Sequence, residues 1–428
     1  MLPDSRAKLP RQRADARPSI WAGIFPFSSL RPSLGLLVVS AYLIRSSLLV
    51  IWFPGLAKAL LVSVYLLLGL SLVYSLLSAR EVSFAGVLLL LACLPGSWFA
   101  EQREVSLLKY GGWAILLLVA GPLLAGPNAR RVRNQAWNAL AVFLALIGVA
   151  SCLWWLLRLP VLGLGLFTGV MTYSNTVGAI AGLGAVLAAG RAIASQSWPR
   201  LVWIFITMAS ILTCLASGAR ASALAMGAGL AVVLFVERRK VNLLQIFILA
   251  FGLMAGLAVY KLFIQAEDST EITSGLMEKG LENTREFLWA ARWQEFHENP
   301  LCGVGVGLAK GEESSGNATD EEGDANVEPG SSYLAVLSMT GLSGAAGFGI
   351  FFLSVGVRFS GRYRFLPAGV ASELLGAGTF LFFNGIAEGW ILAVGSPLCM
   401  IFWLWLGYLV DVLGEQKPER KTKVKIQQ

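Results

Sequence analysis

The sequence has little charge and a single histidine. Of its 428 residues, 14% are charged and 56% are apolar, whereas an ordinary soluble domain carries about 25% charged residues. This shortage of charge excludes an ordinary soluble protein. The net charge of +8 is typical of basic segments that lie beside anionic lipid headgroups, so it does not indicate nucleic-acid binding.

The motifs of several common sites are also missing. The sequence has no G-x-x-x-x-G-K-[ST] segment, and no strand precedes the glycine-rich "CGVGVG", which excludes a P-loop ATP site and a dinucleotide fold. His297 has no second His or Cys nearby, so we expect it at the surface rather than in a metal site. The acidic "DEEGD" lacks the spacing of an EF-hand and is interpreted as solvated. No cofactor and no metal ion are therefore expected.

Long apolar runs are what the sequence has in abundance. A helix needs about 20 apolar residues to cross the hydrocarbon core of a bilayer, and we count twelve such segments. The fold is therefore predicted to be an all-α, polytopic membrane protein. The expected spans are 34–54, 57–77, 84–100, 108–126, 135–157, 166–190, 201–217, 221–236, 242–264, 332–357, 366–386 and 390–412.

Lysine and arginine indicate the orientation of these spans, because short cytoplasmic loops collect basic residues. With the N-terminus inside, the cytoplasmic segments hold 23 of the 34 basic residues and the opposite side holds 10, with Arg45 inside the first span. An even number of spans then places both basic termini in the cytoplasm. Since the first apolar run is long enough to remain in the membrane, no cleavable signal peptide is expected.

One long loop divides the chain. Residues 265–331 carry 15 of the 26 acidic residues, and Cys302 is the one cysteine of this loop, which excludes an intramolecular disulfide there. Its first half predicts an amphipathic helix that begins near Thr284 and ends before Pro300, and its acidic second half predicts a flexible flap. The expected divisions are a basic tail (1–33), nine spans (34–264), the outer loop (265–331), three spans (332–412) and a second basic tail (413–428).

Polar residues near the predicted spans are the candidates for function, since ionisable groups at membrane depth are costly. Arg220 lies in the tight turn of "LASGARASA", where the alternative is an arginine that extends to the lipid interface. Arg285 lies in the loop helix, with a solvated charge as the alternative. Arg292 lies almost two turns later and is interpreted as solvated, although we retain it among the candidate substrate-binding residues.

Three further candidates lie near the ends of predicted helices. Glu328 precedes "PGSSYLAVL", where a carboxylate near a helix N-terminus is favoured by the helix dipole, which is also its structural alternative. Tyr173 and Asn175 lie near the outer end of the sixth span, whose small residues are otherwise explained by close helix packing. Arg45 and Glu388 lie near spans and are candidates for an ion pair.

In their order, these stretches resemble the O-antigen ligase and polymerase superfamily, over about residues 160 to 412. "GLFTGVMTYSNTVGAIAG" is similar to the family's "F-x-G … N" span, and "LTCLASGARASALA" to its "L-T-x-S-R-G-A" turn. "TREFLWAARWQEFHENPLCGVGVG" is similar to "R-x-x-x-W … P-x-x-G-x-G", and "SSYLAVLSMTGLSGAAGF" to "H-N-x-Y-L-x-x-L-x-x-x-G-x-x-G". The resemblance assigns the family's two key arginines to Arg220 and Arg285.

The resemblance implies further residues around these arginines. Trp289, Pro300, Gly303 and Gly305 are expected to support the site, and Trp289, Ser332 and Tyr333 join the candidate substrate-binding residues. The chain departs from the ligases at one position, because Gly330 stands where they have a histidine. Glu328, two residues earlier, is our hypothesis for the group that orients or deprotonates the acceptor hydroxyl.

The function implied is that of an inverting, metal-independent membrane glycosyltransferase. Family members take a glycan from an undecaprenyl-pyrophosphate-type lipid on the outer face of the bacterial cytoplasmic membrane and transfer it to a glycan or lipid-anchored acceptor. Polymerase and ligase both stay open, with the missing histidine favouring a polymerase or exopolysaccharide-type member. The alternative is a transporter or flippase of lipid-linked glycans, although no internal repeat of the kind common in transporters is evident. Membrane lipids are the other expected partners, and the sequence leaves the oligomeric state open.

Overall fold

The computed structural model describes residues 34–159, 167–237, 284–308, 330–363 and 366–415. These residues form 13 helices and one two-stranded sheet, which confirms the all-α membrane fold. Seven of the helices are long and apolar enough to cross a membrane, and three more are apolar but shorter. The two basic tails, the ninth predicted span, the predicted acidic flap and Glu328 lie outside the described residues.

The described helices match eleven of the twelve expected spans. In chain order they are α2 (Leu34–Arg45), α3 (Leu49–Trp52), α4 (Pro54–Leu76), α5 (Phe84–Trp98), α6 (Arg103–Val119), α7 (Pro127–Leu156), α8 (Ser174–Ala194), α9 (Ser197–Ala216), α10 (Arg220–Val236), α13 (Thr284–Glu298), α14 (Ser332–Arg362), α15 (Ala368–Ala387) and α16 (Pro397–Glu415). The strands β1 (Glu81–Val82) and β2 (Leu124–Ala125) pair antiparallel.

Several helix boundaries differ from the sequence prediction, and α8 and α16 begin eight and seven residues after the predicted starts of their spans. The first expected span is two helices, because the chain leaves α2 after Arg45 and the short α3 follows. α7 begins at Pro127, eight residues before the predicted start, with the proline at the helix N-terminus where its missing N–H costs nothing. The arginines of "NARRVRN" therefore lie in the first two turns of α7, whereas the sequence predicted a loop.

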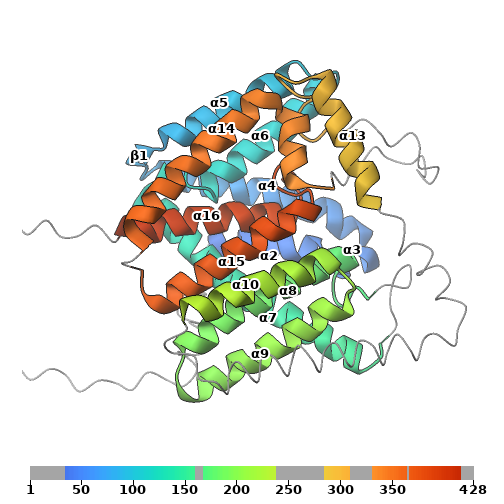
Figure 1. Cartoon of the computed structure of the whole chain (residues 1–428), viewed down its shortest axis with the longest axis vertical. Coiled ribbons are helices and arrows are strands. Elements are labelled where there is room, and N and C mark those ends of the chain that lie inside the picture. Colours follow the sequence, from blue (N-terminus) through green and yellow to red (C-terminus); the bar gives the residue numbers. More distant parts are fainter. Residues whose placement is uncertain (1–33, 160–166, 238–283, 309–329, 364–365, 416–428) are drawn as a thin grey trace, which may run out of the picture.

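The helices pack in two groups around α16 (Figure 1). α8 packs against α7, α9, α10 and α15, while α5 packs against α6 and α14, and α16 contacts members of both groups. α8 is mostly buried because its small residues let neighbours approach closely. Gly178 faces Ser217 and Ala219, and Gly182 faces Phe380, so a side chain at either glycine would clash with its neighbours.

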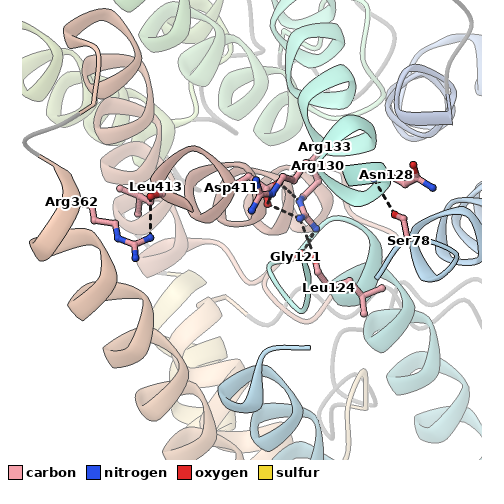
Figure 2. A network of polar contacts seen from close by, with 9 residues as sticks. All are labelled: Ser78, Gly121, Leu124, Asn128, Arg130, Arg133, Arg362, Asp411 and Leu413. Carbon is pink, nitrogen blue, oxygen red and sulfur yellow. Dashed lines mark hydrogen bonds and ion pairs between the residues drawn. The ribbon is translucent and has the colours of Figure 1, made fainter. Parts of the chain in front are cut away.

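A buried ion pair joins α7 to α16 (Figure 2). Arg133 is 1% exposed, and its Nε and Nη2 donate to the two carboxylate oxygens of Asp411 at 2.6 and 2.7 Å. Its Nη1 and Nη2 also donate to the carbonyls of Gly121 and Leu124. Every side of the guanidinium is thus engaged, as burial of a charge requires. Arg133 falls between two predicted spans, 108–126 and 135–157, so this buried contact was not predicted from the sequence.

A second ion pair lies at the same end of the bundle. Arg191, near the end of α8, contacts Glu373 of α15 at 3.1 Å, and the indole N–H of Trp137 in α7 donates to the same carboxylate. We call this end of the bundle the Arg133 end. The opposite end, where α8 and α10 begin and α9 and α15 finish, is called the Arg220 end.

Candidate functional site

The segment before α8 is held against the end of α2 at the Arg220 end. The N–H of Leu48 donates to the carbonyl of Val170, and the N–H of Thr172 donates to the carbonyl of Ser46. Tyr173 then precedes the first turn of α8, with 69% of its surface exposed, and Asn175 is also exposed. Both candidates therefore face outward at this end.

The turn between α9 and α10 packs directly on this part of α8. Gly218 adopts a φ of +69°, which favours glycine, and the hydroxyl of Ser217 accepts from the N–H of Ala219. Because Gly178 of α8 fits closely against this turn, the start of α8 and Arg220 are neighbours. Arg220 is the first residue of α10, its side chain is exposed, and it forms no hydrogen bond or ion pair with the described residues.

Asn384 joins α10 to the last part of the chain. This amide is fully buried near the end of α15; it donates to the hydroxyl of Ser222 at 3.1 Å and accepts from the indole N–H of Trp390 at 2.9 Å. Ser222 lies two residues after Arg220. The sequence analysis did not single out Asn384, Ser222 or Trp390, although an asparagine inside the apolar "TFLFFNGIA" is a signal that buried polar residues have partners.

Ser332 fixes the start of α14 to the same segment. Its hydroxyl donates to the carbonyl of Glu388 at 2.7 Å and accepts from the N–H groups of Trp390 and Ile391. The next residue, Tyr333, donates its hydroxyl to the carbonyl of Phe382 in α15 at 2.9 Å. Both candidates thus hold helices together at the Arg220 end, a role the sequence did not predict.

The loop helix α13 docks on the residues that lead into α14. Its bounds agree with the predicted cap at Thr284 and the end before Pro300. The indole N–H of Trp289 donates to the carbonyl of Gly330 at 2.9 Å, and Gly330 has a φ of +69° beside the side chain of Leu288. Figure 1 shows α13 standing beside the first part of α14. Arg285 lies in the first turn of α13, and its side chain is outside the described residues.

Arg292 is buried, so the prediction that it is solvated was wrong. It is 2% exposed and forms an ion pair with Glu295, which is 3% exposed, at 2.9 Å. The two residues are one turn apart on α13, and the packing of this helix covers them both. His297, by contrast, is exposed as predicted and contacts the carbonyl of Trp293 through Nδ1.

The glycine-rich loop after α13 fills a break in α14. At Gly341 the helix is interrupted, with φ +64° and ψ −165°. The interruption frees backbone groups of α14, and the loop pairs with them: Val304 and Gly305 donate to the carbonyls of Ser338 and Met339, and Leu342 donates to Pro300. The break thereby keeps its hydrogen bonds at membrane depth, as burial in protein allows.

Positive φ angles explain the glycines of this loop. Gly303, Gly305 and Gly307 have φ values of +75°, +111° and +73°. Ser106 and Lys109 of α6 donate to the carbonyls of Val306 and Gly307, so the loop is also fixed from the other side. The backbone of "CGVGVG" thus links α14 to α6 through hydrogen bonds. Pro300, Gly303 and Gly305 lie in or beside this loop.

The last contact at this end involves Arg45. Its Nη1 donates to the carbonyl of Gly395 at 3.3 Å, in the same connection between α15 and α16 that holds Trp390. The Arg220 end therefore gathers the starts of α8, α10 and α14 and the segment 388–395. Among the described residues, this end also presents exposed side chains of four candidates: Tyr173, Asn175, Arg220 and Tyr333.

Part of the chain is similar to a known protein family. Residues 205–349 match the O-antigen ligase family model. The matched region lies inside the resemblance seen in the sequence and confirms it over these residues. It contains most of α9, all of α10 and α13, and the first part of α14, and so includes Arg220, Arg285 and Glu328. Tyr173 and Asn175 precede it.

The helices describe a multi-pass membrane protein, and its residues 205–349 are similar to the O-antigen ligase family. None of the curated proteins compared with the chain matches it. The roles of individual residues are therefore inferred from the geometry of the Arg220 end.

Proposed function

We propose that the protein transfers a glycan from a polyprenyl-pyrophosphate lipid to an acceptor hydroxyl at the Arg220 end. The observation that carries the proposal is the exposed guanidinium of Arg220 at the start of α10, within the O-antigen ligase match. α10 has no side-chain cap, so its first N–H groups are free of such a partner and favour an anion. A guanidinium beside them suits a pyrophosphate oxygen.

The transfer step requires stabilisation of the leaving group. The bond between the anomeric carbon and the pyrophosphate oxygen breaks as the acceptor oxygen bonds to that carbon from the opposite side, which inverts the anomeric configuration. Arg220 and Arg285 bind the oxygens that gain negative charge, an effect of roughly 10²- to 10³-fold per donor. No metal ion takes part in this scheme. Glu328 receives the proton of the acceptor hydroxyl, which contributes about 10²- to 10⁴-fold.

The remaining candidates are assigned to substrate contact and support. Tyr173 and Asn175 are exposed at the start of α8, which packs through Gly178 on the turn before Arg220, and we propose that they contact the glycan. Trp289, Ser332 and Tyr333 hold α13, α14 and α15 in place, and Arg292 with Glu295 stiffens α13. We place the Arg220 end on the outer side of the bacterial cytoplasmic membrane, because the excess of basic residues lies on the opposite side.

The test follows lipid-linked glycans on a gel after the purified full chain in lipid nanodiscs has been given a polyprenyl-pyrophosphate oligosaccharide. A ladder of longer lipid-linked products indicates a polymerase, and transfer that begins only when a lipid-anchored acceptor is added indicates a ligase. Glu328→Gln should lose most of either activity. Glu298→Gln, an exposed acid at the end of α13, is the matched control and should keep it.

A donor that stays unchanged with every acceptor, yet crosses the bilayer in a flipping assay, would contradict the proposal in favour of the transporter. Full activity in Glu328→Gln would remove Glu328 from the proton transfer and leave the transferase assignment in place.

A further inference from the structure

Two arginines from different helices reach the last turns of α16 at the Arg133 end (Figure 2). Arg130 lies near the start of α7, and its Nε is 3.7 Å from a carboxylate oxygen of Asp411. Arg362 is the last residue of α14, and its Nη1 donates to the carbonyl of Leu413 at 3.1 Å. The end of α16 is thus contacted by one arginine of α7 and one of α14.

The charges of these residues do not cancel. Both carboxylate oxygens of Asp411 accept from Arg133, at 2.6 and 2.7 Å, so its charge is matched without Arg130. Among these four described residues, three arginines face one aspartate, which leaves an excess of two positive charges. The negative end of the α16 dipole and the positive end of the α7 dipole, each about half an elementary charge, offset one another. An anion is therefore attracted to this place.

The sequence that follows α16 does not supply that anion. α16 ends at Glu415, and residues 415–428 hold five basic and two acidic residues. The two acids are outnumbered within their own segment. The excess of positive charge thus grows when the tail is included, and the expected anion is a separate molecule.

Arg130 has N–H groups without an acceptor. A distance of 3.7 Å to Asp411 is longer than a hydrogen bond, and the Nε of Arg130 is buried with no hydrogen-bond partner among the described residues. The side chain as a whole is 40% exposed, so part of it reaches the surface. Phosphate oxygens suit these donors, because a guanidinium binds them through two parallel hydrogen bonds.

The position of the arginines along the helices favours a lipid as the source of the phosphate. α7, α14 and α16 are all long and apolar enough to cross a membrane, and the contacts lie where α14 and α16 end. In the last three turns of α14, Leu353 and Val357 are 68% and 64% exposed, as expected of a helix that faces lipid. A phospholipid beside α14 would place its chains against these residues and its phosphate near the arginines.

We propose that Arg130 binds the headgroup phosphate of an anionic phospholipid in the leaflet at the Arg133 end, with Arg362 adding positive charge beside it. In the orientation proposed above, this is the cytoplasmic leaflet, where basic sites between spans recognise anionic headgroups. The site lies at the opposite end of the bundle from Arg220, so the inference does not rest on the proposed transfer reaction.

The experiment measures the unfolding temperature of the purified full chain in an uncharged detergent while phosphatidylglycerol is added. A ligand that binds the folded protein raises this temperature by mass action. Arg130→Gln should raise the lipid concentration that gives half of the increase by about tenfold or more, because it removes charge-assisted hydrogen bonds to phosphate. The matched control is Arg131→Gln, which removes the same charge from the next, exposed residue. It should shift that concentration by less than about twofold, since exposed charges are screened.

The unfolding temperature without lipid checks that Arg130→Gln is folded. It should stay near the wild-type value, because Arg133 keeps its own contacts with Asp411 and the contact of Arg130 is long. If it falls, Arg130→Lys takes the place of this variant. The lysine keeps the charge and loses the two parallel hydrogen bonds, so it should also weaken the response to phosphatidylglycerol, and an unchanged response would overturn the proposal.

Two further ligands separate the possible sources of stabilisation. Phosphatidylcholine has a phosphate but no net charge, and it should stabilise the wild type and Arg130→Gln equally and less than phosphatidylglycerol does. Sodium phosphate at the same phosphate concentration should leave the unfolding temperature unchanged. Equal stabilisation of wild type and Arg130→Gln by phosphatidylglycerol overturns the proposal. Stabilisation by sodium phosphate that Arg130→Gln abolishes overturns the lipid and indicates a site for a soluble anion.

Discussion

Asn384 is a buried amide that links three parts of the chain at the Arg220 end. It contacts Ser222 in α10 and Trp390 after α15, and lies in α15 itself. Trp390 and Ser332 share a further hydrogen bond, so the positions of α10 and α14 depend on one another through these side chains. A single buried polar residue thus helps to place Arg220 relative to the start of α14.

Asn384→Leu should destabilise the protein, because it leaves the hydroxyl of Ser222 and the indole N–H of Trp390 buried without this partner. Each unsatisfied group costs about 1–3 kcal/mol. The measurement is thermal unfolding of the purified protein in mild detergent, followed by tryptophan fluorescence. The control is Asn138→Leu, where the amide contacts Asn134 of the same helix, and little change is expected. Equal unfolding temperatures for the two variants would contradict the linking role of Asn384.

The sequence predicted the surroundings of some residues and missed those of others. The sequence indicated Arg220 because an arginine in a tight turn between apolar spans is unusual. Its exposure at the start of α10 fits both a substrate contact and an arginine that extends to the lipid interface. The burial of Arg133 was not predicted, because its partner Asp411 lies 278 residues away and a count of basic residues carries no information on such a contact. The interpretation of Arg292 as solvated was also wrong, because the burial of residues on α13 depends on tertiary packing.

At the scale of elements, helix ends and a helix break position the site. α14 is broken at Gly341, and the glycine-rich loop forms hydrogen bonds with the backbone groups that the break leaves without a helical partner on either side. Hydropathy predicted α14, since it depends on composition over about 20 residues, and α13 was predicted from its amphipathic pattern, its cap and Pro300. It could not predict the break, because a glycine at φ +64° is identified by its neighbours in space and not by the apolar sequence around it.

The connection between α7 and α16 should depend strongly on its buried ion pair (Figure 2). Asp411→Asn removes the charge that Arg133 faces in a site where the arginine is 1% exposed. Loss of one partner from a buried pair costs about 3–5 kcal/mol. We expect a clear drop in the unfolding temperature in detergent. Glu373→Gln, in the less buried pair with Arg191, is the comparison and should cause a smaller drop.

The double variant Arg133→Met with Asp411→Leu tests the cause of this loss. Because it removes both charges, its unfolding temperature should recover toward that of the wild type. A double variant less stable than Asp411→Asn would contradict the explanation from an uncompensated charge and would favour the carbonyl contacts of Arg133 at Gly121 and Leu124 as the main contribution.

At the scale of the whole molecule, the two ends of the bundle differ in their polar contacts. Among the described residues, ion pairs between helices at the Arg133 end join Asp411 to Arg133 and Arg130, and Glu373 to Arg191. The Arg220 end is held mainly by hydrogen bonds, among them those of Ser332, Asn384 and Arg45, and it leaves Arg220, Tyr173, Asn175 and Tyr333 exposed. This difference suits a reaction site at the Arg220 end, with the ion pairs at the Arg133 end holding the helices together.

Release of isoprenyl pyrophosphate from a polyprenyl-pyrophosphate oligosaccharide is the measurement that tests the central claim most directly. A polymerase and a ligase both release this leaving group, whereas a transporter does not. With donor and acceptor supplied, the wild-type protein should release it, and Arg220→Ala should lower the rate by about 10²-fold or more. Arg103→Ala is the control, since Arg103 is exposed and stacks on Trp98 at 3.6 Å; it should keep the wild-type rate. Equal rates for wild type and Arg220→Ala, or no release from any donor, would contradict a glycosyl-transfer site at the Arg220 end.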